Sequence, residues 1–274
     1  MARFKGLMVS LPFGFLLFIC STFIIVPGVI GWSKEGHEMT CLIAQALLKP
    51  EASEAVKHLL PPNVNGNLSA LCVWPDQIRH WYKYRWTSPL HFIDTPDDKC
   101  GFQYSRDCHE DQCVAGAIKN FTSQLSHYKE GTSDRRYNMT EALLFLAHFT
   151  GDIHQVWDRE IILTALADYY DKDVTLLLQD IEKNYTNGIW SDDVVSWEHC
   201  NDISRCVNNW AKESIQIACK WGYEGVKSGT TLAEDYFDSR MPYVMKRIAQ
   251  GGIRLAMMLN QVFGDSEEGF VAAT

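Results

Sequence analysis

The sequence predicts a single, mainly helical domain. Apolar residues recur at the i, i+3, i+4 spacing of helices through most of the chain, and prolines separate these stretches. Stretches in which apolar and polar residues alternate, as in half-buried strands, are nearly absent. The chain has 274 residues, 46% of them hydrophobic, and nine tryptophans, which is enough for a sizeable core. We therefore expect one all-α domain, with at most one short hairpin near Lys99–Tyr104.

Eight segments carry the helical spacing. In chain order they cover residues 37–48, 50–60, 113–128, 139–155, 159–170, 173–185, 206–226 and 243–263. Pro50 and the pair Pro61–Pro62 bound the second segment, and Gly131 lies between the third and the fourth. Pro75, Pro89 and Pro96 interrupt the stretch between the second and third segments, which we expect to be irregular. No internal repeat or long linker divides the chain.

The first 31 residues are typical of a signal peptide. A short basic start, Arg3 and Lys5, precedes an uncharged apolar run, and the small residues Val29 and Gly31 precede Trp32. An uncleaved membrane anchor is the alternative, but Pro12, Gly14 and Pro27 interrupt the run. We expect cleavage before Trp32, a domain over residues 32–264, and a flexible, removable tail over residues 265–274.

The cysteines and glycosylation sequons are consistent with export. Eight cysteines remain after Cys20 leaves with the signal, and an even number in an exported chain predicts four disulfides. Short spacing favours the pairs Cys108–Cys113 and Cys200–Cys206. A cysteine zinc site is disfavoured because no C-x-x-C motif occurs. Sequons begin at Asn67, Asn120, Asn138 and Asn184. We expect a secreted, disulfide-bonded glycoprotein.

The net charge argues against nucleic-acid binding by the bare protein. The formal charge is -9, and loss of the two positive charges of Arg3 and Lys5 gives -11 for the mature chain. Such a chain repels phosphates unless positive charge is concentrated locally. A bound divalent metal could supply that charge.

The stretch "HFTGDIHQVWD" contains two histidine–aspartate pairs. His148 and Asp152 are spaced i, i+4, as are His154 and Asp158, so each pair projects from one helical face. At about 100° per residue, the second pair lies roughly 120° around the helix from the first. One uninterrupted helix therefore cannot direct both pairs at one metal cluster.

Three further segments contain potential metal ligands. His91 lies in "PLHFIDTPDD" and Asp76 in "CVWPDQIRH", both interrupted by proline. His37 follows Trp32 by five residues, and a new amino terminus at Trp32 would have a pKa near about 8 and could bind a metal once deprotonated.

Together these motifs resemble those of the S1/P1 nuclease family, and specifically the plant bifunctional nucleases. The matching stretches are "WSKEGHEMT", "WPDQIRHW", "SPLHFIDTP", "LAHFTGDIHQ" and "VWDREII". The resemblance implies a helical fold with three zinc ions per chain. It implies that Trp32, His37 and Asp152 hold one zinc, and that Asp76, His91, His148 and Asp152 hold its neighbour.

The ligands of the third zinc are incomplete. "GDIHQ" runs directly into "VWDREII", so the family's intervening segment is missing, and with it two histidines. Asp158 remains, and His154 lies four residues before it. His154 could assist Asp158 in holding zinc, but the helix angle disfavours this. We expect two tightly bound zinc ions and a reduced rate.

The resemblance also implies the activity and the substrate contacts. It implies an endonuclease acting on single-stranded DNA and RNA, with 5′-phosphate products and 3′-nucleotidase activity, in a monomer. Asp76 would orient or deprotonate the attacking water, Arg79 would contact phosphate, and Phe92 and Asp94 would bind a base. A surface salt bridge for Arg79 and core packing for Phe92 are the alternatives. It further implies the disulfides Cys41–Cys72 and Cys100–Cys219.

Two other functions stay open at this level. One is a phosphodiesterase of phospholipase C type, which an exposed apolar rim beside the cluster would favour. The other is a secreted isoform without turnover. We expect Trp74, Trp81, Trp86, Trp157 and Trp190 to pack in the core. The remaining histidines outside the motifs, His58, His80, His109, His127 and His199, are expected to be surface or satisfied core residues.

Overall fold

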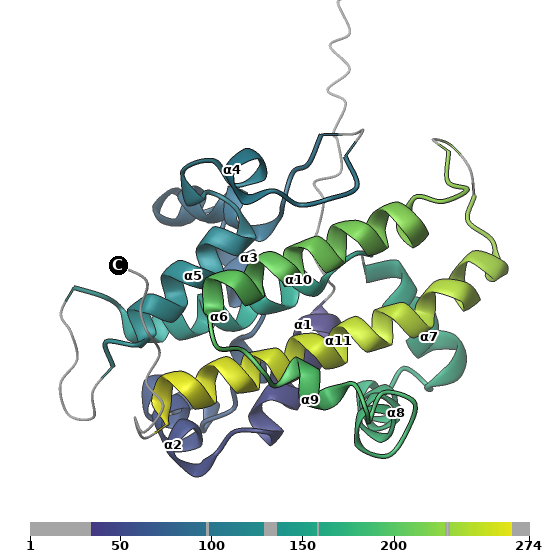
Figure 1. Ribbon diagram of the computed structural model, residues 1–274. Coiled ribbons are helices and arrows are strands. Elements are labelled where there is room, and N and C mark those ends of the chain that lie inside the picture. The colour runs from purple at the N-terminus through teal and green to yellow at the C-terminus, as the bar shows by residue number, and fades with distance from the viewer. Residues whose placement is uncertain are drawn as a thin grey trace, which may run out of the picture.

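The computed structural model describes residues 34–96, 99–128, 136–157, 159–227, 229 and 231–264 (Figure 1). Within these ranges every regular element is a helix, which confirms the all-α prediction. The short hairpin that the sequence allowed near Lys99–Tyr104 is absent from the described residues. Cys100 is bonded to Cys219 there, and a helix begins at Tyr104, so the segment has no partner strand. The predicted signal peptide and the tail from residue 265 lie outside the described residues.

The eight predicted helices correspond to eight observed helices in the same order. They are α1 (Lys34–Ala46), α2 (Pro50–Leu59), α5 (Val114–Leu125), α6 (Met139–His154), α7 (Arg159–Tyr169), α8 (Val174–Thr186), α10 (Ile203–Ile217) and α11 (Glu234–Phe263). Three short α-helices were not predicted: α3 (Trp74–Ile78), α4 (Tyr104–Asp107) and α9 (Val194–Trp197). The remaining turns are η1 (Pro62–Val64), η2 (Ser69–Leu71), η3 (Tyr82–His91), η4 (His109–Asp111) and η5 (Ala218–Gly222).

Side-chain caps fix where several helices begin. Asn138 accepts a hydrogen bond from the Glu141 N–H at the start of α6, and Asp202 accepts one from the Arg205 N–H at the start of α10. Such caps satisfy backbone donors that have no partner inside the helix, and each contributes about 1 kcal/mol. The start of α6 matters most, because this helix contains His148 and Asp152, which are predicted to bind metal.

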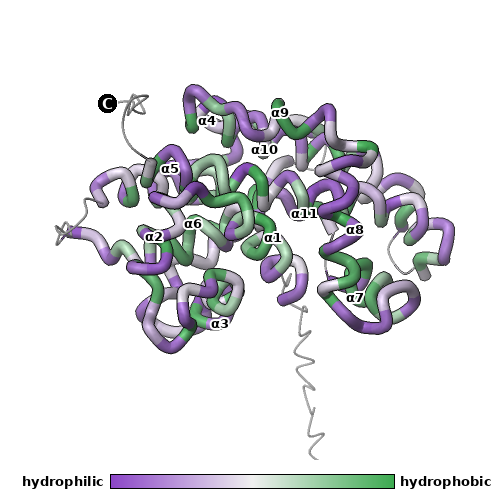
Figure 2. Tube along the Cα trace, turned by 90° about the horizontal axis from the view of Figure 1, so that it is seen from below, coloured by the Kyte–Doolittle hydropathy of each residue, from purple (hydrophilic) through white to green (hydrophobic). Residues whose placement is uncertain are grey.

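The long helix α11 connects two hydrophobic cores. It packs on α1 and α6, and also on α2, α7 and α8. One core lies among α2, α5 and α6, and the other among α7, α8 and the first half of α11. Figure 2 shows α1 and α6 in the middle of the molecule, with α2 and α3 on one side and α7 and α8 on the other. Among the described helices, none is long and apolar enough to cross a membrane.

Helix α11 approaches α1 closely at Gly252. A Cβ atom at this position would lie 2.5 Å from Ile43 Cβ and 3.0 Å from the Thr40 carbonyl oxygen. Only glycine therefore allows the two backbones this spacing. The contact fixes α1, which contains His37, against the centre of the fold.

Helix α6 is enclosed on all sides. Every residue from Ala142 to His154 is buried. His148 and His154, on different faces of α6, are therefore both inside the protein but meet different neighbours. This arrangement agrees with the helix angle inferred from the sequence.

Candidate metal centre

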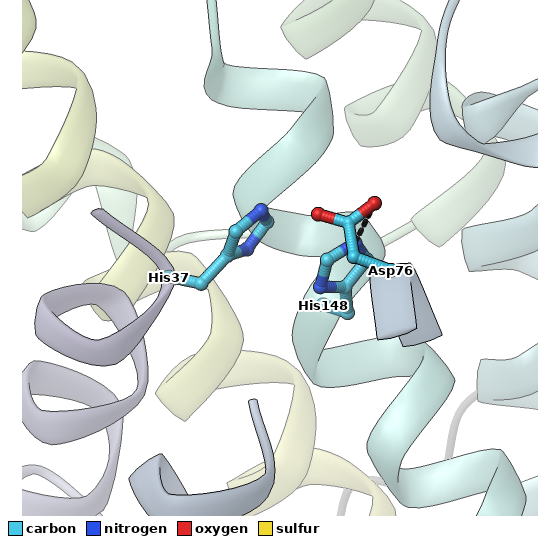
Figure 3. Close-up of side chains that lie close together, drawn as sticks. All are labelled: His37, Asp76 and His148. Carbon is cyan, nitrogen blue, oxygen red and sulfur yellow. Dashed lines mark ion pairs between the residues drawn. The ribbon is translucent and has the colours of Figure 1, made fainter. Parts of the chain in front are cut away.

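Five predicted ligands from four segments meet in the interior. His37 comes from α1, Asp76 from α3 and His91 from the end of η3, while His148 and Asp152 come from α6. Figure 3 shows His37, Asp76 and His148 converging, with the Asp76 carboxylate directed at the His148 ring. His37, His91, His148 and Asp152 are buried, whereas Asp76 is partly exposed. We call these five residues the cluster.

Three atoms of the cluster lie close enough together to bind one zinc ion, and a fourth lies near two of them. His91 Nδ1 lies 3.1 Å from His148 Nε2 and 3.0 Å from Asp152 Oδ2, and the latter two atoms are 3.2 Å apart. Asp76 Oδ1 lies 3.5 Å from His91 Nδ1 and 3.8 Å from His148 Nε2. Tetrahedral zinc with bonds of about 2.0–2.2 Å separates its ligand atoms by about 3.3–3.6 Å. The nitrogens of His91 and His148 and one oxygen of Asp152 therefore form a group that could hold a zinc ion, with Asp76 Oδ1 close to both nitrogens.

Asp152 faces two sides of the cluster. While Oδ2 contacts His91 and His148, the other oxygen, Oδ1, lies 3.3 Å from His37 Nε2. The His37 and His148 rings stack with centroids 3.9 Å apart. One oxygen of Asp152 therefore faces His91 and His148, and the other faces His37. A carboxylate placed in this way could bind two metal ions at once.

Two features that the sequence analysis missed hold this arrangement. Gly151 allows His37 to approach α6, because a Cβ atom there would lie 2.6 Å from His37 Nδ1. His148 Nδ1 lies 2.8 Å from the Cys72 carbonyl oxygen, to which it can donate a hydrogen bond, so Nε2 faces the cluster. The disulfide Cys41–Cys72 ties this carbonyl to α1, one turn after His37. Such outer contacts fix the tautomer of a ligating histidine.

Buried polar atoms without hydrogen bonds also indicate a cation. Within the described part of the chain, His91 Nε2 and Asp76 Oδ1 are buried and make no hydrogen bond. Burying a carboxylate oxygen without a hydrogen bond is costly, and a bound cation relieves that cost.

The charges of the cluster favour metal ligation. Burial alone would raise the pKa of Asp152, but the neighbouring His148 and hydrogen bonds from the histidines hold it well below the usual range. Burial, and then His148, lowers the pKa of His37, which favours the neutral imidazole that binds metals. Burial would also lower the pKa of His148, but the Asp152 carboxylate outweighs this and raises it. A metal must therefore compete with a proton at His148.

His154 does not join the cluster. Its Nδ1 lies 2.7 Å from the Thr150 carbonyl oxygen, and its Nε2 lies 2.8 Å from Arg254 NH1. Burial and the cations Arg247 and Arg254 lower its pKa well below the usual range, so the ring is neutral. A guanidinium donor at Nε2 occupies the lone pair that zinc would need, so this geometry disfavours His154 as a ligand, and the ligand role stays a prediction. Asp158 and Trp32 lie outside the described residues.

The partners of His154 form a buried charged network that the sequence analysis also missed. Arg254 donates two hydrogen bonds to Glu213, and Arg247 donates to Glu213 and to the His154 carbonyl oxygen. Ser214 donates to the Ile153 carbonyl oxygen. The network therefore satisfies carbonyls at the end of α6, immediately after Asp152. The sequence feature that could have revealed this network is the pair Arg247 and Arg254, which lie seven residues apart at positions of the last helix that are otherwise apolar.

The predicted substrate residues lie at the edge of the cluster. Arg79 NH1 is 3.6 Å from Asp76 Oδ1, and both side chains are largely buried. The alternative interpretation of this pair as a salt bridge on the surface is therefore disfavoured. Phe92, next to His91, is 44% exposed, so its alternative interpretation as a core residue is wrong. Asp94 is also exposed.

The tryptophan prediction is partly wrong. Trp157 and Trp190 are buried and Trp74 is partly buried, as predicted, but Trp81 and Trp86 are 61% and 54% exposed. Both lie in the turns between Asp76 and His91, where the buried aromatic residue is instead Tyr84, which packs on Trp74 and Phe145.

The four predicted disulfides are confirmed. The structure contains the bonds Cys41–Cys72, Cys100–Cys219, Cys108–Cys113 and Cys200–Cys206. Among the sequon asparagines, Asn67, Asn120 and Asn138 are exposed and Asn184 is partly buried. The histidines outside the motifs (58, 80, 109, 127 and 199) are all exposed, as expected.

A cavity of about 540 Å³ lies elsewhere, between α7, α8 and α11. Tyr169, Trp190 and Phe237 are among its lining residues, and none of the cluster residues lines it. We identify the functional site with the cluster, because its ligand chemistry and not a cavity volume defines it.

A family model described as S1/P1 Nuclease matches residues 32–155 and 154–264. The chain belongs to the S1/P1 nuclease family. The resemblance inferred from the motifs is thereby confirmed. The two matched segments of the S1/P1 nuclease model meet at residues 154–155, within "GDIHQVWD".

Curated relatives in the S1/P1 nuclease family agree. The chain is 59% identical to Endonuclease 1 of Arabidopsis thaliana, covering 91% of this chain and 92% of the relative. It is 44% identical to Endonuclease 4 of the same plant, covering 87% and 91%. It is 26% identical to Nuclease P1 of Penicillium citrinum, covering 85% and 98%. These names support the classification of the chain as a hydrolase of the endonuclease type.

Proposed function

We propose that this chain is a zinc-dependent endonuclease that hydrolyses single-stranded DNA and RNA to 5′-phosphate products, with 3′-nucleotidase activity. The observation that carries this proposal is that ligand atoms of His91, His148 and Asp152 lie 3.0–3.2 Å apart, with Asp76 Oδ1 at 3.5 and 3.8 Å from the two histidine nitrogens. Zinc bound there lowers the pKa of a water toward about 7 and offsets negative charge on the phosphoryl group.

Side chains at and beside the cluster would accept the proton of the attacking water and bind the phosphate and the base. Asp76, at the exposed side of the cluster, accepts a proton from the attacking water. Arg79 donates hydrogen bonds to a phosphoryl oxygen, and Phe92 stacks on the adjacent base while Asp94 accepts from its N–H groups. Water oxygen bonds to phosphorus as the bond from phosphorus to the 3′-oxygen breaks. The 3′-oxygen takes a proton, and the phosphate stays on the 5′ side of the next nucleotide.

We further propose that two zinc ions bind tightly and that the rate is lower than in relatives with an intact third site. Asp76, His91, His148 and Asp152 would hold one ion, and His37 and Asp152, with the Trp32 amine, the other. Support comes from His154, whose ring nitrogens are taken by Thr150 and Arg254. Zinc sites usually have at least three protein ligands, and Asp158 alone provides one.

The decisive measurement combines metal content with cleavage. Zinc per protein is measured by mass spectrometry on the purified mature chain. Cleavage of single- and double-stranded DNA is followed before and after dialysis against a chelator, and after zinc is restored. We expect two zinc ions and chelator-sensitive cleavage of the single strand, leaving 5′-phosphates. Three ions with the full rate of a relative would overturn the two-zinc proposal, and cleavage unaffected by the chelator would overturn the zinc chemistry.

We also propose that the chain is secreted as a monomeric glycoprotein beginning at Trp32. Three of the four sequon asparagines are exposed, which suits glycan attachment. Peptide mapping of the secreted protein tests this proposal. An active form that retains residues before Trp32, or sequons without glycans, would contradict it.

A further inference from the structure

The segment between Asp76 and His91 exposes aromatic and cationic side chains together. Trp81, Tyr82 and Trp86 are 61%, 91% and 54% exposed. Lys83 and Arg85, which alternate with them in "WYKYRW", are also exposed. We call these five residues the aromatic–basic surface. Large aromatic side chains so exposed are a feature of binding surfaces.

The segment is held rigidly from below. Tyr84 is buried, its hydroxyl lies 2.8 Å from Glu141 Oε1, and the Thr87 hydroxyl donates to the Tyr84 carbonyl oxygen. Trp86 contacts Phe145 at its inner edge. The exposed side chains are thus presented by a fixed backbone, which lowers the entropic cost of binding.

The local charge is opposite to that of the whole chain. The five residues of the aromatic–basic surface include two cations, Lys83 and Arg85, and no aspartate or glutamate, whereas the chain carries -9. Lys83 lies 3.4 Å from Glu141, but its side chain is 72% exposed, and an exposed pair of this kind is weak. Phosphates can therefore compete for Lys83.

The surface is continuous with the cluster along the chain. Trp81 follows Asp76 by five residues, and Trp86 precedes His91 by five residues. Consecutive Cα atoms are about 3.8 Å apart, so both backbones lie within about 19 Å of a cluster residue. A strand held at the cluster can reach the surface with a few nucleotides.

We propose that the aromatic–basic surface binds the same single strand outside the cluster, with bases stacked on Trp81 and Tyr82 and phosphates on Lys83 and Arg85. The inference rests on the proposed nuclease function and deepens it, because the surface selects polymers over mononucleotides. Aromatic stacking accepts any base, and alternating cations follow the backbone. The alternation of cations with aromatics favours a polyanionic strand over a lipid surface.

Binding is measured with the full chain and a fluorescent twenty-nucleotide oligothymidylate with phosphorothioate linkages, which keeps bases and charge but resists cleavage. The double variant Trp81→Ala/Tyr82→Ala should bind at least about tenfold more weakly. The double variant Lys83→Gln/Arg85→Gln should reduce the slope of log affinity against log salt by about 1.4, at about 0.7 for each phosphate contact.

Matched controls separate the surface from general effects. Tyr223→Ala removes a tyrosine outside the segment that is 73% exposed. Lys57→Gln removes a lysine that is 65% exposed and, like Lys83, lies near one glutamate. Both controls should bind as the parent does. Zinc content and helicity of all variants should match the parent, because the altered side chains are exposed.

Cleavage distinguishes this inference from the proposed function. The aromatic variant should lose about tenfold in kcat/KM on a twenty-nucleotide strand and keep its rate on a 3′-mononucleotide. Equal losses on both substrates, or unchanged oligothymidylate binding, would overturn the inference. Loss of phosphatidylcholine vesicle binding with intact oligothymidylate binding would overturn it in favour of a lipid surface. If no zinc-dependent cleavage occurs but the variants still lose oligothymidylate binding, the inference stands and the nuclease proposal fails.

Discussion

Replacing Gly151 by alanine tests the geometry of the metal centre with one methyl group. Gly151 precedes Asp152 on α6, and an added Cβ atom would lie 2.6 Å from His37 Nδ1 and 3.0 Å from its Cε1. The His37 ring is fully buried and stacks on His148 with centroids 3.9 Å apart. The His37 ring therefore cannot move away from the added methyl group without losing its stacking contact with His148.

The displacement can be estimated from these distances. Ordinary van der Waals contact begins at 3.4 Å, so the ring must move by about 0.8 Å, the difference from 2.6 Å. Metal–ligand distances tolerate about 0.2 Å, and a misplacement of about 1 Å can cost about 100-fold in rate. Fold stability should change little, because alanine favours the helix by about 1 kcal/mol while the overlap costs about 1–3 kcal/mol.

We therefore expect Gly151→Ala to lose the zinc held by His37 and about 100-fold in cleavage rate, while the free energy of unfolding changes by less than about 2 kcal/mol. Zinc is counted by mass spectrometry, cleavage is followed on single-stranded DNA, and unfolding is measured in urea without reductant. Gly222→Ala is the control, because its Cβ atom would meet Val156 at an ordinary 3.7 Å. Full zinc content and rate in Gly151→Ala would refute the role of His37 as a ligand.

Three further predictions concern the cluster and the network behind it. Asp152→Ala should abolish cleavage and zinc binding, because Asp152 faces three histidines. Asp158→Ala should have a smaller effect. A larger loss in Asp158→Ala than in Asp152→Ala, measured on single-stranded DNA, would contradict the assignment of the metal site. Arg247→Leu should lower the free energy of unfolding, measured in urea, by about 3–5 kcal/mol. The substitution removes one partner of Glu213 and the hydrogen bond to the His154 carbonyl oxygen at the end of α6. A decrease of less than about 1 kcal/mol would argue that Arg247 does not stabilise the end of α6. Burial would raise the pKa of Glu213, but the hydrogen bond from Arg254 and the charge of Arg247 lower it below 4.5, so its stabilisation is present above pH 4.5 and is lost as the pH falls below that value. The stability advantage of the parent over Glu213→Gln should therefore shrink with acidification in thermal melts, and a constant difference would exclude the linkage.

The sequence by itself determined the helices and the local disulfides. Helical periodicity and proline positions are properties of short segments, so all eight predicted helices were recovered in order. The i, i+4 spacing of His148 and Asp152 likewise places both on one face of α6. The 120° offset of His154 was enough to predict that it would meet other neighbours.

The choice of ligands depended on resemblance rather than on local pattern. His37, Asp76 and His91 lie in three separate segments, and no periodicity brings them together. Only the motifs shared with a known family predicted that these three residues belong to one site. The structure then gave the distances, including the two directions of the Asp152 carboxylate.

Tertiary structure alone decided which residues are exposed and which charges are paired. Trp81 and Trp86 are exposed while the neighbouring Tyr84 is buried against Trp74 and Phe145, a distinction that composition cannot reveal. His154 is paired with Arg254, a residue one hundred positions later in the chain. Burial and ion pairing are set by contacts between distant segments, and such contacts exist only after α6, α10 and α11 have packed together.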